Sequence, residues 1–349
     1  MYKSNLNLFL SNNELPSQEE IVSYFNSNKP KVSILCTCYN HAKYIESTIK
    51  GFLIQKSKFP FEIIIHDDAS KDGSKDIIER FREKYPSLIK LIIQDENVYS
   101  KDKQAPLRNC LDSAEYDYIA LCEGDDFWFD PEKLEKQMNV LLSHKDLSMV
   151  VAPGLVSESP FSKKKLHCYH GADSITFNNI NSVLYQSNQF APTASYLFKR
   201  SILNFLYSDA FSEMSITDLF IEIYAIRLGG IIYIPEIMSY YRLASFGSWS
   251  EKMRDGGTEA LIEYYYSLYS LIDKDPYLRS LNWERKLAII SLSIALSFLK
   301  NKDYKGFKSY LTLSRFHHNF PQFKFRIIYM FSQTPSLLNI LFTLLGRFK

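Results

Sequence analysis

The sequence lacks the short signatures of several large ligand-binding families. No Gly-x-Gly-x-x-Gly follows the first predicted strand, which argues against a dinucleotide-binding domain, and the absence of Gly-x-x-x-x-Gly-Lys-Ser/Thr excludes a P-loop. The five cysteines are odd in number and form no Cys-x-x-Cys, and no set of histidines and cysteines has the spacing of a zinc site. We therefore expect reduced cysteines that pack as small hydrophobic residues.

Long hydrophobic runs and a large excess of one charge are also missing. The longest apolar run, Leu287–Leu299, is interrupted by serines and is shorter than the ~20 residues that span a bilayer. No positively charged start followed by an apolar run marks a signal peptide. A net charge of +2 argues against general nucleic-acid binding. We expect a cytoplasmic protein with no nucleic-acid partner.

The sequence does contain a large apolar fraction and a regular alternation of strands and helices. Hydrophobic residues make up 46% of the 349 residues, enough for a large core and two domains. Apolar runs separated by helical patterns predict four strands: Val32–Thr37, Phe61–Ile65, Ile89–Ile93 and Tyr118–Cys122. Their spacing of roughly 30 residues is typical of βαβ units in a parallel sheet. Residues 17–20 predict a capping box, Met149–Ala152 a further strand, and residues 153–180 irregular structure.

The fourth predicted strand ends in three acidic residues on one short turn: Glu123, Asp125 and Asp126. Carboxylates this close repel one another unless a cation lies among them, and hard oxygen ligands suit Mg²⁺ or Mn²⁺. Gly124 lets the backbone turn sharply enough for the carboxylates to converge. Asp130–Pro131 predicts the start of a helix, with Asp as the N-cap. The competing interpretation is a solvated acidic turn.

A second acidic pair, Asp67–Asp68, follows the second predicted strand. The carboxyl ends of the strands in an open α/β sheet are where such sheets bind ligands. If the two strands are neighbours, this pair faces Asp125–Asp126 across a crevice. Two acidic pairs at one end of a sheet indicate a shared ligand.

Four motifs in order resemble those of family 2 inverting glycosyltransferases. They are the first strand with its extension, the second strand with its turn, an Arg-Asn pair and the acidic turn: residues 32–40, 63–74, 108–109 and 123–128. The resemblance covers about residues 31–250. It implies the GT-A fold, a Rossmann-like mixed α/β sheet flanked by helices. It also implies a nucleotide-diphosphate sugar as donor, with a UDP-sugar as the first expectation.

The resemblance assigns roles to individual residues. Five would bind the nucleotide: Thr37, Tyr39, Asp68, Arg108 and Asp125. Among them, Asp68 would hydrogen-bond the base and Arg108 would lie by the nucleotide or its phosphates. Three would hold Mn²⁺ or Mg²⁺, which neutralises the charge of the diphosphate leaving group: Asp126, Asp125 and Glu123. The competing interpretations are core packing for Tyr39 and a surface charge for Arg108.

Two later segments also resemble the family. Residues 191–200 are similar to the segment below the acceptor site, and residues 215–220 to the segment that carries the general base. An inverting transfer needs one carboxylate to take the proton of the acceptor hydroxyl. Asp218 is our candidate because it is the only charged residue in residues 215–220. The competing interpretation is that Asp218 is the N-cap of a helix over Leu219–Leu228.

Residues 240–249 resemble the flexible loop that closes over the donor. On this resemblance three residues are assigned to the donor and its loop: Trp128, Arg242 and Trp249. The sequence departs from the family here, because many relatives place a histidine two residues after the arginine and this chain has Ala244. The third protein ligand of the metal is therefore open, and water can complete the shell.

The remainder of the chain predicts an all-helical extension. We divide the chain into an N-terminal extension, a GT-A domain and a helical C-terminal region with a basic amphipathic tail: residues 1–30, 31–250 and 251–349. Asp275–Pro276 predicts a helix start. Residues 304–349 carry seven Lys or Arg and no Asp or Glu. This tail suits an anionic membrane surface, and the competing interpretation is that its apolar residues pack on the helical region.

Together these patterns predict a metal-dependent inverting glycosyltransferase of the hexosyltransferase type. It would move a sugar to a hydroxyl of a growing glycan, free or lipid-linked, in bacterial cell-surface polysaccharide synthesis, at the inner face of the cell membrane. The substrate rests on the family resemblance alone. The alternatives are a catalytically inactive nucleotide- or glycan-binding relative and a sugar nucleotidyltransferase.

Overall fold

The computed structural model describes the following residues: 2–12, 14–157, 159, 162–187, 189–214, 217–243, 245, 251, 255–318 and 328–344. The chain forms two compact units. Unit 1 comprises Met1–Val183 with Gln189–Ser248, and unit 2 comprises Leu184–Asn188 with Trp249–Lys349.

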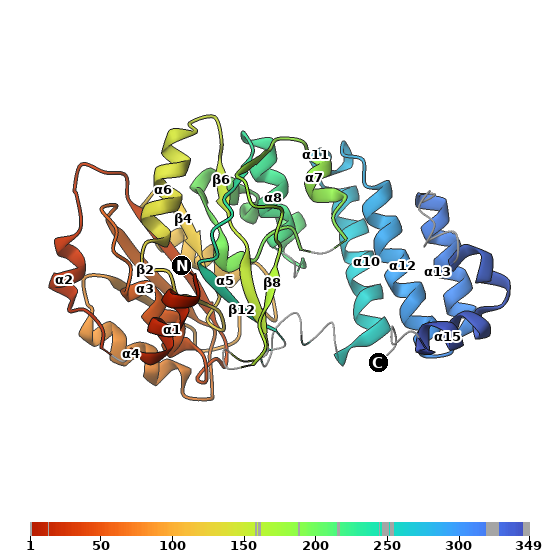
Figure 1. Cartoon of the computed structure of the whole chain (residues 1–349), viewed down its shortest axis with the longest axis horizontal. Coiled ribbons are helices and arrows are strands. Elements are labelled where there is room, and N and C mark those ends of the chain that lie inside the picture. The colour runs from red at the N-terminus through yellow and green to blue at the C-terminus, as the bar shows by residue number, and fades with distance from the viewer. Residues whose placement is uncertain are drawn as a thin grey trace. The chain divides into compact units, whose positions relative to one another are not determined.

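Unit 1 is built on an eight-stranded sheet in the order β3-β2-β1-β4-β10-β6-β11-β9. Strands β2, β4 and β6 of this sheet are labelled in Figure 1. Its strands are β1 Val32–Cys38, β2 Phe61–Asp67, β3 Ile89–Ile93, β4 Tyr118–Leu121, β6 Met149–Val151, β9 Ile175–Phe177, β10 Leu197–Lys199 and β11 Ile231–Tyr233. The first four are parallel, whereas β10 runs antiparallel to β4 and β6, and β9 antiparallel to β11. The predicted mixed sheet is therefore confirmed.

Helices pack against this sheet. They are α3 Ile45–Leu53, α4 Ser74–Lys84, α5 Ala105–Ser113, α6 Lys133–Ser143 and α8 Asp218–Arg227. Helix α4 packs on β2 and β3, α5 on β1 and β2, α6 on β6 and β10, and α8 on β11. The buried core consists mainly of aliphatic side chains of β1 and β2 with those of α3 and α6. Short helices complete the unit: α2 Gln18–Ser23, α7 Asn181–Leu184, η1 Thr193–Ser195, η2 Arg200–Tyr207 and η3 Asp209–Phe211.

A second sheet of four strands follows the order β5-β12-β7-β8. The strands are β5 Phe127–Trp128, β7 Gly154–Ser157, β8 Lys165–His167 and β12 Ser239–Arg242. Helix α1, Tyr2–Ser11, packs on this sheet, with Leu6 in a cluster that includes Phe127, Leu155 and Tyr240. The phenyl rings of Phe9 and Phe127 stack with centroids 4.9 Å apart.

Two local predictions were wrong and two were confirmed. Residues 153–180 contain β7, β8 and β9, and the last two escaped prediction because their side chains are largely exposed and show no apolar alternation. Helix α6 begins at Lys133, two residues after Pro131, because Pro131 and Glu132 form a turn, and Pro131 O accepts from Lys56 N (2.7 Å). Ser17 does form a capping box at α2, and Asp275 does cap a helix.

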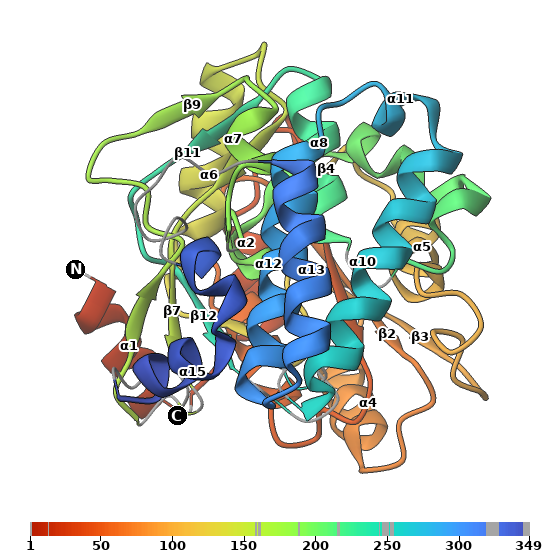
Figure 2. The same ribbon diagram turned by 90° about the vertical axis from the view of Figure 1, so that its right-hand side faces the viewer.

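Every regular element that the structure describes in residues 251–349 is a helix, as predicted. The helices of unit 2 are α10 Gly257–Lys274, α11 Pro276–Arg279, α12 Glu284–Lys300, α13 Tyr304–His317, η4 Phe331–Gln333 and α15 Pro335–Leu344. Helices α12 and α13 pack side by side, and Figure 2 shows them running alongside each other. Ile328 and Leu338, both from the basic tail, are buried in the core of this unit. No helix among the described residues is long and apolar enough to cross a membrane.

Candidate active site

The two acidic turns lie on either side of the carboxyl end of β1. Gly124 N donates to Thr37 O (2.9 Å), and Asp68 N donates to Cys38 O (2.9 Å). Strand β1 lies between β2 and β4, so the two acidic pairs follow strands that are separated by one strand. Both turns nevertheless share the same edge of the sheet, where open α/β sheets bind ligands.

Gly124 is required for space rather than for an unusual backbone conformation. A Cβ at this position would lie 2.8 Å from His41 Nδ1 and 3.2 Å from Thr37 O. Its φ is not positive. Helix α3 fixes the same turn, because Thr48 Oγ1 donates to the carbonyls of Gly124 (3.0 Å) and Asp126 (2.5 Å).

Asp126 is the most enclosed acid of the turn. Its side chain is 1% exposed, and Oδ1 accepts from Arg242 N (2.8 Å). Oδ2 is buried and has no hydrogen-bond partner among the described residues. Burial, followed by the charges of Asp125 and Glu123, raises the pKa of Asp126 well above its ordinary value, although Arg242 opposes this. Such an oxygen needs a proton or a cation to become stable.

Arg242 supplies the positive charge beside these acids. Its guanidinium donates to Asp125 O and to Ser47 Oγ (2.7 Å), and it lies 4.9 Å from the ring centroid of Tyr44. The side chain is 5% exposed, so these partners hold it in place. The carboxylate of Asp125 accepts from Ser245 Oγ. Arg242, which we assigned to the donor loop, thus forms part of the wall of the acidic turn.

Glu123 lies within electrostatic reach of Asp218. Reduced hydration raises the pKa of Glu123 to about 8, with further contributions from the charges of Asp125 and Asp218. Its side chain is nevertheless exposed to solvent. The contribution of Asp218 means that the charges of the predicted general base and of the acidic turn interact in the folded protein.

Asp218 is held by a chain of hydrogen bonds. Its Oδ2 accepts from Gln189 Nε2 (3.0 Å), and Oδ1 accepts from Leu219 N (2.7 Å). Gln189 Oε1 lies 3.2 Å from His167 Nε2. Because the amide already donates to Asp218, the histidine must donate to the amide oxygen. The N-cap position of α8 falls on Thr217, so the competing interpretation of Asp218 as the N-cap is not supported.

The predicted nucleotide residues differ in their surroundings. Asp68 is 2% exposed, and its carboxylate accepts from Val98 N (2.7 Å) and Tyr99 N (3.1 Å), so it anchors that loop. Tyr39 is 41% exposed, which excludes core packing.

Thr37 and Arg108 are each half-buried. Thr37 contributes its carbonyl to the acidic turn. The guanidinium of Arg108 donates to Asp102 Oδ2 (2.5 Å) and Leu206 O (3.2 Å), so this arginine is already paired.

Trp128 and Lys133 lie behind the acidic turn. Trp128 is fully buried and its Nε1 donates to Ala194 O (2.7 Å), so it supports the turn and has no surface free to contact a donor. Lys133 Nζ lies 4.0 Å from the Trp128 ring centroid and donates to Gln137 Oε1 (2.6 Å). Burial lowers the pKa of Lys133 to about 7. Trp249 and Ala244 lie outside the described residues.

The acids of the turn do not form a complete set of metal ligands. Among the described residues, no group of three or more His, Cys, Asp or Glu is arranged to hold a metal ion. Asp125 is turned toward Ser245, which leaves the free oxygen of Asp126 and the exposed carboxylate of Glu123. Mg²⁺ and related ions commonly take one or two carboxylates together with substrate phosphates. The residues fit that kind of shared site.

Three partners in this region were missed from the sequence: Ser245, Gln189 and His167. Each acts through a contact across a long sequence separation, such as the 29 residues between Gln189 and Asp218. Local patterns carry no signal for such contacts. The hydrogen bond between Ser245 and Asp125 spans 120 residues.

Comparisons with known proteins agree on one family. Residues 33–206 match the family model described as Glycosyl transferase family 2. An uncharacterized protein of Mycobacterium tuberculosis is 30% identical over 230 residues, which cover 64% of this chain and 62% of that protein. The chain thus matches less than two thirds of that relative's length. The putative teichuronic acid biosynthesis glycosyltransferase TuaG of Bacillus subtilis is 31% identical over 152 residues, 43% of this chain and 57% of TuaG.

A solved structure has a similar fold. It is a mannosyltransferase from Pyrobaculum calidifontis in complex with GDP-Man and Mn²⁺, with a TM-score of 0.51 and 16% identity. The similarity covers 98% of this chain and 93% of that one.

Proposed function

Because the chain belongs to glycosyl transferase family 2, we propose that it is a metal-dependent inverting glycosyltransferase. It takes one sugar from a nucleotide-diphosphate sugar, with a UDP-sugar as the first candidate, and joins it to a hydroxyl group. The observation that carries this proposal is the acidic turn after β4. There a buried oxygen of Asp126 has no described partner and lies near Glu123 and Asp125.

The acidic turn would hold the diphosphate through a divalent cation. Asp126 Oδ2 and the exposed carboxylate of Glu123 would be its protein ligands, with Asp125 behind them. The cation would neutralise charge on the departing diphosphate. Mn²⁺, the ion in the solved mannosyltransferase of similar fold, is the first to test. Arg242 would keep the acids in place by balancing their charge, while Thr48 fixes the turn backbone.

Asp218 would act as the general base. As the acceptor oxygen bonds to the anomeric carbon and the bond to the diphosphate breaks, the acceptor proton passes to Asp218. Hydrogen bonds from Gln189 and Leu219 N favour a charged carboxylate that can accept this proton. The influence of Asp218 on Glu123 supports its placement near the diphosphate.

The nucleotide would lie along the carboxyl ends of β1 and β2. The exposed ring of Tyr39 is available to contact the nucleotide. Asp68 would contact the base with the acceptor capacity left after binding Val98 N and Tyr99 N. Thr37 would line the nucleotide-binding site, and Arg108 would lie by the nucleotide or its phosphates. Trp249 would belong to the loop that covers the donor.

We further propose that the acceptor is a glycan, free or lipid-linked, in cell-surface polysaccharide synthesis. The name of TuaG, a putative teichuronic acid biosynthesis glycosyltransferase, supports this class of acceptor. Synthesis of that kind starts from cytoplasmic nucleotide-sugars, so the enzyme would work at the inner face of the membrane. Residues 31–250 would form the transferase domain and residues 251–349 an accessory region.

The experiment is to incubate the protein with Mn²⁺ and a panel of UDP-, GDP- and dTDP-linked sugars and to measure release of the nucleoside diphosphate. One donor should be hydrolysed slowly without acceptor and faster with a suitable glycan. Binding without release would indicate an inactive relative. In a parallel incubation with added pyrophosphate, formation of a nucleoside triphosphate and a sugar 1-phosphate would indicate a sugar nucleotidyltransferase.

Asp218→Asn provides the matched variant for this assay. It should keep near-normal donor affinity, measured by calorimetry, and lose roughly 10²–10⁴-fold in transfer rate, the usual effect of a general base. Full transfer by the variant would move this role to another residue. Loss of donor affinity would indicate a structural role for Asp218.

A further inference from the structure

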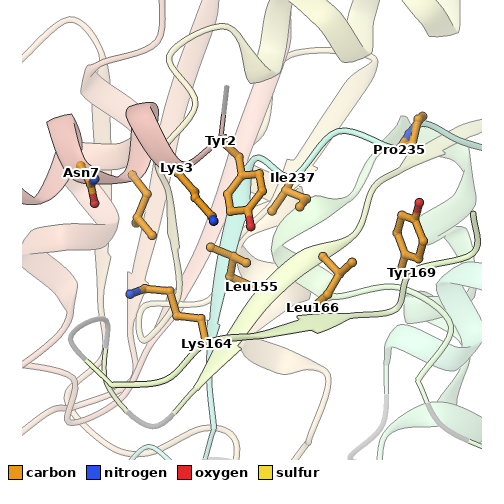
Figure 3. Close-up of a pocket in the computed structure, with 10 residues that line it drawn as sticks. Tyr2, Lys3, Asn7, Leu155, Lys164, Leu166, Tyr169, Pro235 and Ile237 are labelled. Carbon is orange, nitrogen blue, oxygen red and sulfur yellow. The ribbon is translucent and has the colours of Figure 1, made fainter. Parts of the chain in front are cut away.

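A recess in unit 1, separate from the acidic turn, has a volume of about 740 Å³. It lies between α1, the strands β7 and β8, and the segment before β12, and Figure 3 shows its lining side chains. They are Tyr2, Lys3, Leu6, Asn7, Leu155, Lys164, Leu166, Tyr169, Pro235 and Ile237. This size is within the range of small-molecule sites. The recess shares no residue with the proposed transfer site.

One part of the recess is apolar. Leu6 and Leu155 are 3% and 4% exposed and come from α1 and β7. Leu166 is 44% exposed on β8, an edge strand of the four-stranded sheet, and Tyr169 is 50% exposed just beyond it. Exposed large side chains that continue a buried apolar surface are typical of a site that covers them with a ligand.

The other part is positively charged. Lys3 comes from α1 and Lys164 from the residue before β8, and the lining contains no carboxylate. Within the described part of the chain, neither amine takes part in an ion pair. The adjacent acid Glu236 is paired with Lys136 (3.0 Å) and does not neutralise the two lysines. The recess therefore joins an uncompensated positive charge to an apolar surface.

We propose that this recess binds the phosphate end of an anionic lipid. The phosphate binds to Lys3 and Lys164, and the first carbons of the lipid chains cover Leu166, Tyr169 and Ile237. A free phosphate would leave these apolar side chains exposed to water. A neutral lipid would leave the two amines without a counter-charge. Only a ligand with both features satisfies the charged and the apolar parts of the lining.

The test uses the full chain and dihexanoyl phosphatidic acid below its critical micelle concentration, titrated by calorimetry without any sugar donor. Lys3→Gln combined with Lys164→Gln should weaken binding at least tenfold. Lys163→Gln combined with Lys165→Gln is the matched charge control, because both lysines are exposed next to Lys164 and neither lines the recess. Leu166→Gln should also weaken binding, whereas Leu228→Gln, equally exposed on another surface, should not.

Several outcomes would overturn the proposal. They are the absence of binding, an equal loss in the double control variant of Lys163 and Lys165, and equally strong binding of dihexanoyl phosphatidylcholine. Full competition by inorganic phosphate at the same concentration would identify a free-phosphate site instead. Because no donor is present, these results do not depend on whether the chain transfers a sugar. Circular dichroism of each variant checks that it is folded.

Discussion

Gln189 positions Asp218 through a hydrogen bond that has no local sequence signal. A hydrogen bond to a charged group contributes about 1.5–3 kcal/mol, which corresponds to roughly 10–100-fold in rate when the group acts in the transition state. Gln189→Leu should therefore lower kcat by about that factor and leave the KM for the donor nearly unchanged. The measurement is steady-state transfer at saturating acceptor.

The partner of Gln189 provides a control for this variant. His167 Nε2 donates to the same amide, and burial lowers the pKa of His167, so the neutral ring keeps one N–H for this bond. His167→Gln retains an N–H donor and should keep most of the activity, whereas His167→Phe should resemble Gln189→Leu. If all three variants transferred sugar at the wild-type rate, Gln189 would have no role in positioning Asp218.

Lys133 carries a stability cost that depends on pH. Its pKa is lowered to about 7 by burial, against about 10.4 in an unfolded chain. Between these values the unfolded chain binds the proton and the native protein does not, so stability rises with pH by up to about 1.4 kcal/mol per unit. Below pH 7 the cost is fully present. Lys133→Met should therefore exceed the wild type in stability most at pH 7 and least near pH 10.

Urea unfolding at pH 7, 8 and 9 measures this difference. Lys136→Met is the control, because ion pairs with Asp130 and Glu236 keep Lys136 charged in the native protein throughout this range. Its stability relative to the wild type should not change between pH 7 and pH 9. A constant difference between Lys133→Met and the wild type would show that Lys133 is charged in the native protein.

Helix α13 carries the first part of the basic tail. Its three cations, Lys305, Lys308 and Arg315, are exposed. The side chain of Phe316 is 83% exposed as well. The opposite face packs into unit 2 through Phe307 and Leu311. Ile328 and Leu338 are buried as well, so part of the tail is core, as one of the two interpretations from the sequence held. The exposed cations leave the membrane interpretation as a prediction.

Substitution of the three cations of α13 by glutamine tests that prediction without removing core residues. The wild type should sediment with anionic vesicles at low salt, and a much smaller fraction of the variant should do so, because each cation near a headgroup contributes about 1 kcal/mol. Lys71, Lys75 and Lys101, also exposed, form a charge-matched control set. If the variant sediments like the wild type, α13 does not bind the membrane.

The sequence predicted those elements whose cause is local. The strands of the first half are continuous apolar runs, and the caps at Ser17 and Asp275 depend on residues within one turn. Strands β8 and β9 could not be predicted, because short exposed strands depend on partners elsewhere in the chain. The acids after β4 could be identified because they are close together in the sequence. The contact of Arg242 N with Asp126 spans 116 residues and appears only in the fold.

At the scale of the whole chain, the predicted site belongs to one of the two units. The described members of the predicted site all lie in unit 1, whereas unit 2 has its own core. Binding of the donor by unit 1 must therefore appear in the unfolding of that unit. The change in the unfolding free energy on adding a ligand therefore measures binding at the proposed metal and diphosphate site.

The most direct test compares thermal unfolding with a nucleoside diphosphate in Mn²⁺ and in EDTA. At a hundredfold excess over Kd, linkage predicts about 2.7 kcal/mol of added stability, and the increment should require Mn²⁺. Asp126→Asn should lose this increment, while the ligand-free variant should be at least as stable as the wild type, because the amide replaces a buried carboxyl group whose pKa is raised. A Mn²⁺-dependent increment of the same size in Asp126→Asn would contradict the assignment of the acidic turn as the metal and diphosphate site.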